Sequence, residues 1–431
     1  MSAVLFRDAR LIDPEAGTDT RGDLLVEDGR IAARDPGRAA AGAQVIDCAG
    51  RALAPGIVDM NVFVGEPGAR HRESHRTAGL AAAAGGVTTL VAQPGTDPAI
   101  DDPAMVGFVL ARAAEVGRVR VAVMAALTQG REGTRMAELG FLRDAGAVAF
   151  TDGDRPVADA AVFRRALAYA GALGALVVHH PQDPALTRGA CATESFLATK
   201  LGLPAAPAMA ERIMVERDLA LAELTGARLH LSQISTAEAL APLRRAQAEG
   251  LAVSASASVH HLTLNELDIG DWRSFFRLDP PLRSEDDRMA LVEAVADGTV
   301  CAITSAHLPW DEEMKRLPYE EAAPGAVGLE TLLPAALQLV HAGALDLPRL
   351  FARLSTGPAR LLGLEGGSLA AGAPADLVLF DPDAPFVLDR ADLRSRSRNT
   401  PYDGRRMQGR VLGTWVGGRR VFGGATTGAG A

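Results

Sequence analysis

Lysine is almost absent from this sequence, which carries Lys200 and Lys315 and otherwise uses arginine as its basic residue. Cysteine is also scarce: Cys48, Cys191 and Cys301 are odd in number and contain no C-x-x-C pair. This pattern excludes a disulfide framework and favours three reduced thiols. No Gly-x-Ser-x-Gly segment is present, so the sequence gives no sign of a serine-hydrolase nucleophile elbow.

Excess positive charge and long hydrophobic runs are lacking as well. The formal net charge is −9 at pH 7, which argues against nucleic acid or an anionic membrane as partner. Apolar runs such as 166–178 are too short and too rich in small residues to span a bilayer. The chain begins with a strand-like run rather than a basic-then-apolar leader, so we expect a cytoplasmic protein.

The pattern of apolar residues changes twice along the chain. Residues 1 to about 50 read as short strands with Gly and Asp turns. From about 52 to 345, apolar β-rich runs alternate with Ala/Leu/Arg-rich stretches of helical period. The predicted strands of this region are 57–64, 87–93, 119–125, 147–151, 175–179, 228–233, 251–257 and 300–305. Eight such runs predict an α/β protein with a TIM-type (β/α)₈ barrel rather than an open sheet.

Strand character returns after the barrel region, at 375–381, 386–388 and 409–421. We predict that both chain ends form one small β-sandwich, with the barrel inserted between them. The predicted domains are 1–51 and 364–424 for the sandwich and 52–363 for the barrel. Residues 425–431 are predicted to form a flexible tail.

A family resemblance is carried by several segments that occur in order. They are AAAAGGVTTLVAQPGTDP, AFTDGDRPV, LVVHHPQDPAL, RLHLSQIST, DPPLRSEDDR, TSAHLPW and NTPYDGRRMQGRV. With them the chain resembles the dihydroorotases, cyclic amidohydrolases of pyrimidine synthesis that have the amidohydrolase barrel. The frame around residues 55–68 (Pro-Gly-x-x-Asp, then Glu-Pro-Gly) also matches.

The resemblance implies a zinc site at the barrel mouth, made of His on strands one, five and six, a carboxylated Lys or an Asp on strand four, and an Asp on strand eight. At the strand-one, strand-six and strand-eight positions this sequence has Asn61, Phe63, Gln233 and Ala306. Phe cannot bind zinc and a neutral amide binds it poorly. Neither lysine lies near strand four, which excludes a lysine carbamate. We therefore predict that the zinc site is lost and no cofactor is bound, with Asp152 and His179 as its remnants.

The substrate-recognition positions implied by the resemblance have changed too. Gly65 replaces an Arg that would pair with the substrate carboxylate, and Gly95 replaces an Asn. Asp279 replaces another Asn and would repel a dianionic substrate. Only His307 remains, since Pro181 and Trp310 stand where the family has Glu and His.

Other arrangements of chemical groups have simpler explanations. His71 and His75 have the i, i+4 spacing of a zinc pair, but we expect both on a solvated helix face. Of the adjacent pairs His179–His180 and His260–His261, at most one member each could point into the barrel from a strand. Asp97, Asp101, Asp152 and Asp154 could pair for acid/base work, although such residues more often cap helices and close turns.

Together these substitutions predict a catalytically inactive dihydroorotase homologue. The resemblance to a pseudo-dihydroorotase that assembles with aspartate carbamoyltransferase implies an assembly subunit for the catalytic chain of that enzyme, and a homo-oligomer. One alternative is an active dihydroorotase or related cyclic amidase with an atypical metal site. Another is a small-ligand sensor whose mouth is lined by Phe63, Phe150, Leu308 and Trp310.

Overall fold

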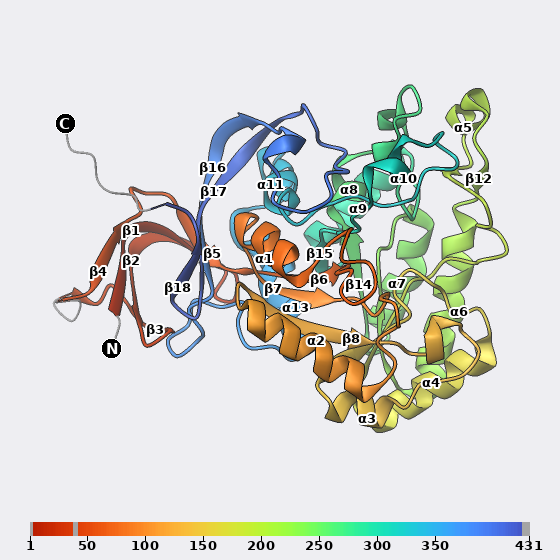
Figure 1. Ribbon diagram of the computed structural model, residues 1–431, viewed down its shortest axis with the longest axis horizontal. Coiled ribbons are helices and arrows are strands. Elements are labelled where there is room, and N and C mark those ends of the chain that lie inside the picture. The colour runs from red at the N-terminus through yellow and green to blue at the C-terminus, as the bar shows by residue number, and fades with distance from the viewer. Residues whose placement is uncertain (1–2, 38–41, 425–431) are drawn as a thin grey trace.

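The computed structural model describes residues 3–37 and 42–424, and Figure 1 shows a sheet of both chain ends beside a larger barrel. The tail predicted for 425–431 lies outside the described residues. Within the described part, each body is built on an eight-stranded sheet. No described helix is both long enough and apolar enough to cross a membrane.

The barrel sheet is parallel and follows chain order. Its strands are β6 (Ile57–Val62), β7 (Val87–Ala92), β8 (Arg120–Ala125), β9 (Ala147–Phe150), β10 (Leu176–His179), β13 (Arg228–Leu231), β14 (Val253–Ser258) and β15 (Ala302–Thr304). Strands covered by side chains inside the barrel and by helices outside read as continuous apolar runs, which is why the sequence reveals them. The predicted barrel is confirmed, and the predicted strand ends differ by one or two residues.

Main-chain hydrogen bonds close the barrel between its first and last strands. The amide of Phe63 donates to the carbonyl of His307 over 2.9 Å, and the amide of His307 donates to the carbonyl of Asn61 over 3.1 Å. Val62 and His307 form the corresponding parallel bridge. Ring closure therefore occurs at the carboxyl ends of the strands, among residues that the family resemblance places at the active site.

Helices follow the strands around the outside of the barrel. The main ones are α1 (His75–Ala84), α2 (Pro103–Val116), α3 (Leu139–Asp144), α4 (Ala160–Ala172), α6 (Met209–Thr225), α7 (Ala237–Ala248), α9 (Glu285–Asp297) and α11 (Leu332–His341). Shorter elements lie in the connections: η2 (Gln129–Arg131), α5 (Phe196–Leu201), α8 (Val259–Thr263), α10 (Glu312–Arg316), α12 (Leu347–Phe351), α13 (Gly357–Leu362) and the two-residue strands β11 (Ala192–Thr193) and β12 (Ala205–Ala206).

Helix α1 illustrates how local sequence fixes these elements. Ser74 caps its first turn through a reciprocal capping box with Thr77. The alanines on its inner side pack into the barrel core at almost no side-chain entropy cost. The cap holds the loop before α1 against the barrel mouth, and this loop carries Arg72 and Glu73.

The second sheet joins the two ends of the chain. Its strands are β1 (Ala3–Asp13), β2 (Thr18–Glu27), β3 (Arg30–Arg34), β4 (Gln44–Asp47), β5 (Ala52–Pro55), β16 (Leu377–Val387), β17 (Arg406–Val416) and β18 (Arg419–Phe422). Strand β5 pairs with β1 on one side and β16 on the other, so Ala52–Pro55 belongs to this sheet although the predicted boundary assigned it to the barrel. Phe6 packs edge-on against Trp415, with ring centroids 4.9 Å apart, in the separate core of this sheet.

Gly56 makes the passage from β5 of the terminal sheet into β6 of the barrel. A Cβ at this position would lie 2.1 Å from the Thr88 side chain, so the close packing of this residue against the neighbouring strand β7 requires glycine. Arg120 of β8 also forms an ion pair with Asp376, which ties the barrel to the segment leading into β16. The two bodies are thus joined where the chain passes between them, at Gly56 and before β16, and by this ion pair.

Candidate functional site at the barrel mouth

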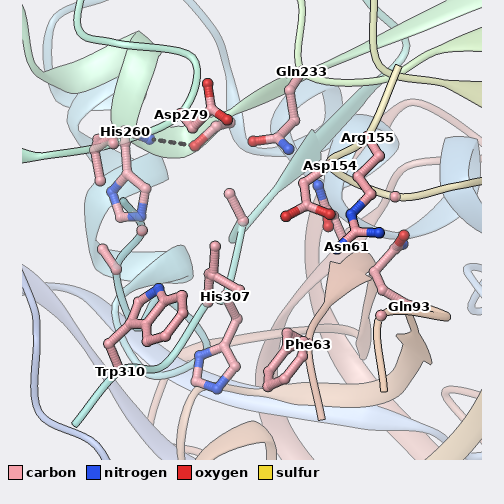
Figure 2. A pocket seen from close by; sticks show the side chains of 18 of the residues that line it. Asn61, Phe63, Gln93, Asp154, Arg155, Gln233, His260, Asp279, His307 and Trp310 are labelled. Atoms are coloured by element: carbon pink, nitrogen blue, oxygen red, sulfur yellow. Dashed lines mark hydrogen bonds between the residues drawn. The ribbon is translucent and has the colours of Figure 1, made fainter. Parts of the chain in front are cut away.

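A cavity of about 260 Å³ opens where the carboxyl ends of the barrel strands meet (Figure 2). Active sites of this fold class lie at the same end of the barrel. Its lining includes the positions that the sequence marked on separate strands: Asn61, Phe63, Gly95, Gln233, Asp279, Ala306 and His307. Three other marked positions, Gly65, Asp152 and His179, are not part of the cavity wall.

The two predicted metal remnants are both engaged in structural contacts. His179 Nδ1 lies 2.6 Å from a carboxylate oxygen of Asp218, and His179 Nε2 accepts the Val157 amide over 2.9 Å. Because Nε2 accepts, the ring proton sits on Nδ1 and is donated to Asp218. Neither ring nitrogen of His179 has a free lone pair for a metal.

Asp152 is likewise committed to the loop after β8. Its carboxylate accepts the amides of Leu127 and Thr128 over 3.0 and 2.9 Å and also the Thr128 hydroxyl. Burial raises the pKa of Asp152 despite these bonds. Across residues 3–37 and 42–424, no group of three or more His, Cys, Asp or Glu side chains could hold a metal ion. The residues at the mouth therefore do not fit a zinc ion.

The backbone of the mouth keeps a strained conformation at two of the changed positions. Gln233 and Ala306 have φ values of 57° and 47°, in the left-handed region that non-glycine residues rarely adopt. Such a conformation costs roughly 1–2 kcal/mol per residue and is concentrated at functional sites. The main chain at the mouth thus has the strained geometry that is typical of functional sites.

The two glycines at substrate-recognition positions differ in their surroundings. A Cβ on Gly65 would lie 2.3 Å from the carbonyl oxygen of Ala69, within a tight turn in which the Ala69 amide donates to the Gly65 carbonyl. A Cβ on Gly95 would instead lie 2.6 Å from Nη1 of Arg131. The loop at Gly65 is reshaped so that no larger residue fits, whereas the space at Gly95 is filled by an arginine from another loop.

Arg72 contributes an unpaired cation to the same cavity. Its guanidinium carbon lies 3.5 Å from the Trp310 ring centroid and 4.3 Å from that of Phe63. Nε donates to the Pro309 carbonyl over 2.8 Å, while Nη2 is buried without a hydrogen-bond partner. Burial lowers the pKa of Arg72 to about 10, so the group stays charged at neutral pH. The sequence analysis missed Arg72, although two aromatic residues at former His positions were a signal for a stacked cation.

His307 contacts a carboxylate that the sequence analysis also missed. Its Nδ1 accepts the Gly328 amide over 3.1 Å, so the ring proton lies on Nε2, which is 3.3 Å from Glu73. Glu73 is fully buried and accepts the Ser395 hydroxyl and the Arg396 amide. The bonds of Glu73 tie the loop before α1 to the segment before β17, and His307 lies beside this carboxylate without a hydrogen bond from Nε2 to the described residues.

The predictions for the pair His260–His261 and for His75 need correction. His260 and His261 both line the cavity, because they lie on the short helix α8 and strand alternation does not apply to them. Burial lowers the pKa of His260 to about 3 and that of His261 to about 4, so both rings are neutral. His71 is exposed as predicted, but the same prediction for His75 was wrong, because His75 is buried at the start of α1.

Two further predictions concern the rim of the mouth. Phe150 lies in the barrel core and does not line the cavity, whose larger apolar side chains are Phe63, Leu278, Leu308 and Trp310. Asp154 lines the cavity and pairs with Arg131, and Asp101 accepts the amide of Gly130. Both aspartates therefore hold loops in place, which was the predicted alternative to acid/base catalysis.

A closed parallel barrel with a second sheet made from both chain ends defines the class of the protein: it has the amidohydrolase fold. The solved structure with which it aligns at a TM-score of 0.89 is an L-hydantoinase (dihydropyrimidinase) from Arthrobacter aurescens, 25% identical, over 98% of this chain and 96% of that one. A D-hydantoinase structure, 24% identical, aligns at a TM-score of 0.85 over 98% and 95% of the two chains and shows the fold alone.

Sequence comparison narrows the class to a family. A family model described as dihydro-orotase-like matches residues 50–239, and an amidohydrolase family model matches 338–422. A dihydroorotase of Pelobacter propionicus is 40% identical over 97% of this chain and 99% of its own. One of Anaeromyxobacter dehalogenans is 43% identical over 98% of both. The chain belongs to the dihydroorotase family, which confirms the resemblance seen in its segments.

Proposed function

We propose that this member of the dihydroorotase family has lost zinc-dependent ring chemistry and acts as an assembly subunit for the catalytic chain of aspartate carbamoyltransferase in pyrimidine synthesis. One observation carries the first half of the proposal. The mouth presents Asn61, Phe63, Gln233 and Ala306 where zinc ligands and a general acid/base would be needed. None of these side chains can deliver a proton at neutral pH, and none offers the imidazole, thiolate or carboxylate group that holds a catalytic zinc ion.

The charge at the mouth supports the loss of the metal. The Arg72 guanidinium stacks on Phe63, at a position where the family resemblance implies a zinc-binding His. A divalent ion there would be repelled by this cation and would find no cluster of anionic ligands among the described side chains. Restoring the site would require more than exchanging individual ligands.

The proposed assembly role rests on the resemblance and is supported by the retained fold. The barrel and its strained mouth backbone persist without the groups that chemistry would need. Large apolar side chains are also exposed near the outer end of the barrel. They include Phe196 on α5 and Met209 and Ile213 on α6, with exposed fractions of 85%, 48% and 42%. Where exposed apolar groups form one contiguous patch, they are typical of surfaces that bind other proteins.

The assembly role is tested by co-expressing the chain with the aspartate carbamoyltransferase catalytic chain of the same organism. We expect the two to co-elute in size-exclusion chromatography with light scattering, and transcarbamoylase activity to fall when this chain is left out. The same measurement on this chain alone gives its own oligomeric state. Separate elution with unchanged transcarbamoylase activity would contradict the proposal.

A second candidate function is dihydroorotase activity through an atypical metal site. It is favoured by the relatives that are 40–43% identical and bear the name dihydroorotase. Purified protein incubated with zinc would be assayed for hydrolysis of dihydroorotate and for bound metal, beside a dihydroorotase with a complete ligand set. Turnover with about one tightly held zinc per chain would establish this function and refute the loss of the site.

A further inference from the structure

Three arginines line the barrel mouth: Arg72, Arg131 and Arg155. Arg131, the last residue of η2, extends over Gly95 and Gly153, where added Cβ atoms would lie 2.6 and 3.4 Å from its guanidinium nitrogens. Its Nε donates to the Asp152 carbonyl over 2.9 Å and its Nη2 pairs with Asp154. The absence of side chains at both glycines makes the room that this guanidinium occupies.

Arg72 differs from Arg131 in having no carboxylate partner. No ion pair of Arg72 occurs among the side chains that the structure describes, and the only hydrogen bond that its guanidinium makes to them goes to the Pro309 carbonyl. Trp310 and Phe63 both pack on its guanidinium, so hydrogen bonding is left to the edge of the group, where Nη2 is buried and unpartnered. A buried donor of this kind costs free energy unless a ligand supplies an acceptor.

We propose that the barrel mouth is a binding site for a small organic monocarboxylate, held by the edge of the Arg72 guanidinium. A planar guanidinium edge matches a carboxylate in geometry and charge and can donate two parallel N–H bonds to it. The apolar side chains Leu278 and Leu308, which line the cavity beside the two rings that cover the guanidinium, suit an apolar or aromatic ligand body. The cavity of about 260 Å³ fits a metabolite rather than a large ligand.

The charged groups that line the cavity favour a ligand with a single negative charge. Arg131 is neutralised by Asp154, and His260 and His261 are uncharged. The other charged groups of the lining are Arg72, Arg155 and the carboxylate of Asp279. The lining is therefore left with about one uncompensated positive charge, and Asp279 would repel a second anionic group on the ligand.

This site is independent of the proposed assembly role. Ligand binding by metal-free protein requires neither catalysis nor the carbamoyltransferase chain. A failure to bind carboxylates would leave the co-elution experiment unaffected, and separate elution of the two chains would leave the binding experiment unaffected.

The test uses matched probes on full-length protein kept in chelator. Benzoate and benzamide have the same shape and differ in charge, phthalate adds a second carboxylate, and inorganic phosphate offers a different oxyanion. Binding is measured by titration calorimetry and by tryptophan fluorescence, because Trp310 lies against the guanidinium. We expect benzoate to bind at least about tenfold more tightly than benzamide, since a hydrogen bond to a charged group is worth about 1.5–3 kcal/mol. Phthalate and phosphate are expected to bind more weakly than benzoate.

Two variants locate the binding to the proposed site. Arg72→Gln removes the charge and is expected to weaken benzoate binding about tenfold or more, with benzamide binding unchanged. Arg76→Gln is the matched control, because Arg76 is exposed on α1 and does not line the cavity. Gly95→Ala, which pushes on Arg131, is expected to change benzoate affinity without unfolding the protein. Circular dichroism verifies the fold of each variant.

The proposal is overturned if wild-type protein binds benzoate no better than benzamide. It is also overturned if a folded Arg72→Gln variant binds benzoate with unchanged affinity. Tighter binding of phosphate than of benzoate would refute the assignment to carboxylates, and tighter binding of phthalate would refute the single-charge argument.

Discussion

Gly65→Ala and Gly95→Ala add the same methyl group at two neighbouring loops of the mouth and should have very different effects on stability. The new Cβ at position 65 meets only backbone: it would lie 2.3 Å from the Ala69 oxygen, 2.8 Å from the Ala69 carbon and 3.0 Å from the Glu73 oxygen. The new Cβ at position 95 would lie 2.6 Å from Nη1 of Arg131, which is the end of a flexible side chain.

The difference between the two variants can be worked out from these contacts. Backbone overlap at position 65 resembles an overpacked core, which costs about 1–3 kcal/mol, and a 2.3 Å contact points to the upper part of that range. At position 95 the loss is at most that of the Arg131–Asp154 pair, about 1 kcal/mol, since Asp154 is 59% exposed. Replacing glycine also recovers about 0.4–1 kcal/mol from the unfolded chain. We expect Gly65→Ala to be less stable than Gly95→Ala by about 2 kcal/mol.

Urea denaturation followed by circular dichroism and tryptophan fluorescence measures this difference as a shift of midpoint. Gly107→Ala is the control, because Gly107 lies exposed in α2 with nothing near its added Cβ and should be stabilised by up to about 1 kcal/mol. Equal midpoints for Gly65→Ala and Gly95→Ala would refute the steric argument. The loop at Gly65 would then be free to move, and a substrate-binding arginine could be restored there.

Three further predictions test other parts of the molecule. Asn61→His combined with Phe63→His should give neither tight zinc binding nor dihydroorotate hydrolysis, because Gln233 after β13 and Ala306 after β15 still provide no zinc ligand and no general acid or base. Metal analysis measures zinc binding, and a turnover assay measures hydrolysis. Burial raises the pKa of Glu330 from 4.5 to about 7, so its contribution to stability is complete below about pH 4.5 and is lost as pH rises through about 7. Glu330→Gln should lack this decline in a series of denaturation midpoints, and an identical pH profile would contradict the assignment. In native protein an amine-reactive label should modify exposed Lys200. Lys315 donates to three carbonyl oxygens and should be labelled only after urea unfolds the chain. Labelling is located by mass spectrometry, and labelling of Lys315 in the native protein would refute this prediction.

The barrel could be predicted from sequence because its strands carry an unambiguous signal. A strand buried on both faces is rich in apolar and β-branched residues, and runs such as 87–93 and 175–179 show this without help from other parts of the chain, although they also contain Thr88, Thr89 and His179. The changed mouth positions could be located for the same reason: each follows a recognisable strand. Asn61 and Ala306, which are far apart in sequence, then meet at one cavity because all eight strands end there.

The contents of the mouth could not be predicted in the same way. Whether a loop arginine such as Arg131 points into the cavity or into solvent depends on side-chain torsions and on space left by residues far away in sequence. The segment at His260 reads as the end of a strand, but Ser258 caps a short helix there and turns both histidines toward the cavity. Glu73 carries no motif, and its role is set by where the segment before β17 folds back.

The bonds that close the barrel have a consequence for how the chain can vary. Phe63, His307 and Asn61 join the first and last strands through amide and carbonyl groups, which every residue except proline provides in full. A requirement to keep the ring shut therefore places almost no demand on the identity of the side chains at these positions. Under the proposed loss of chemistry, mutations could accumulate there without opening the barrel, while prolines at 63 and 307 would still be selected against. A library of substitutions at these three positions, scored only for folding, should be permissive to nearly all amino acids of suitable size but should reject proline at 63 and 307, whose amides donate across the closure.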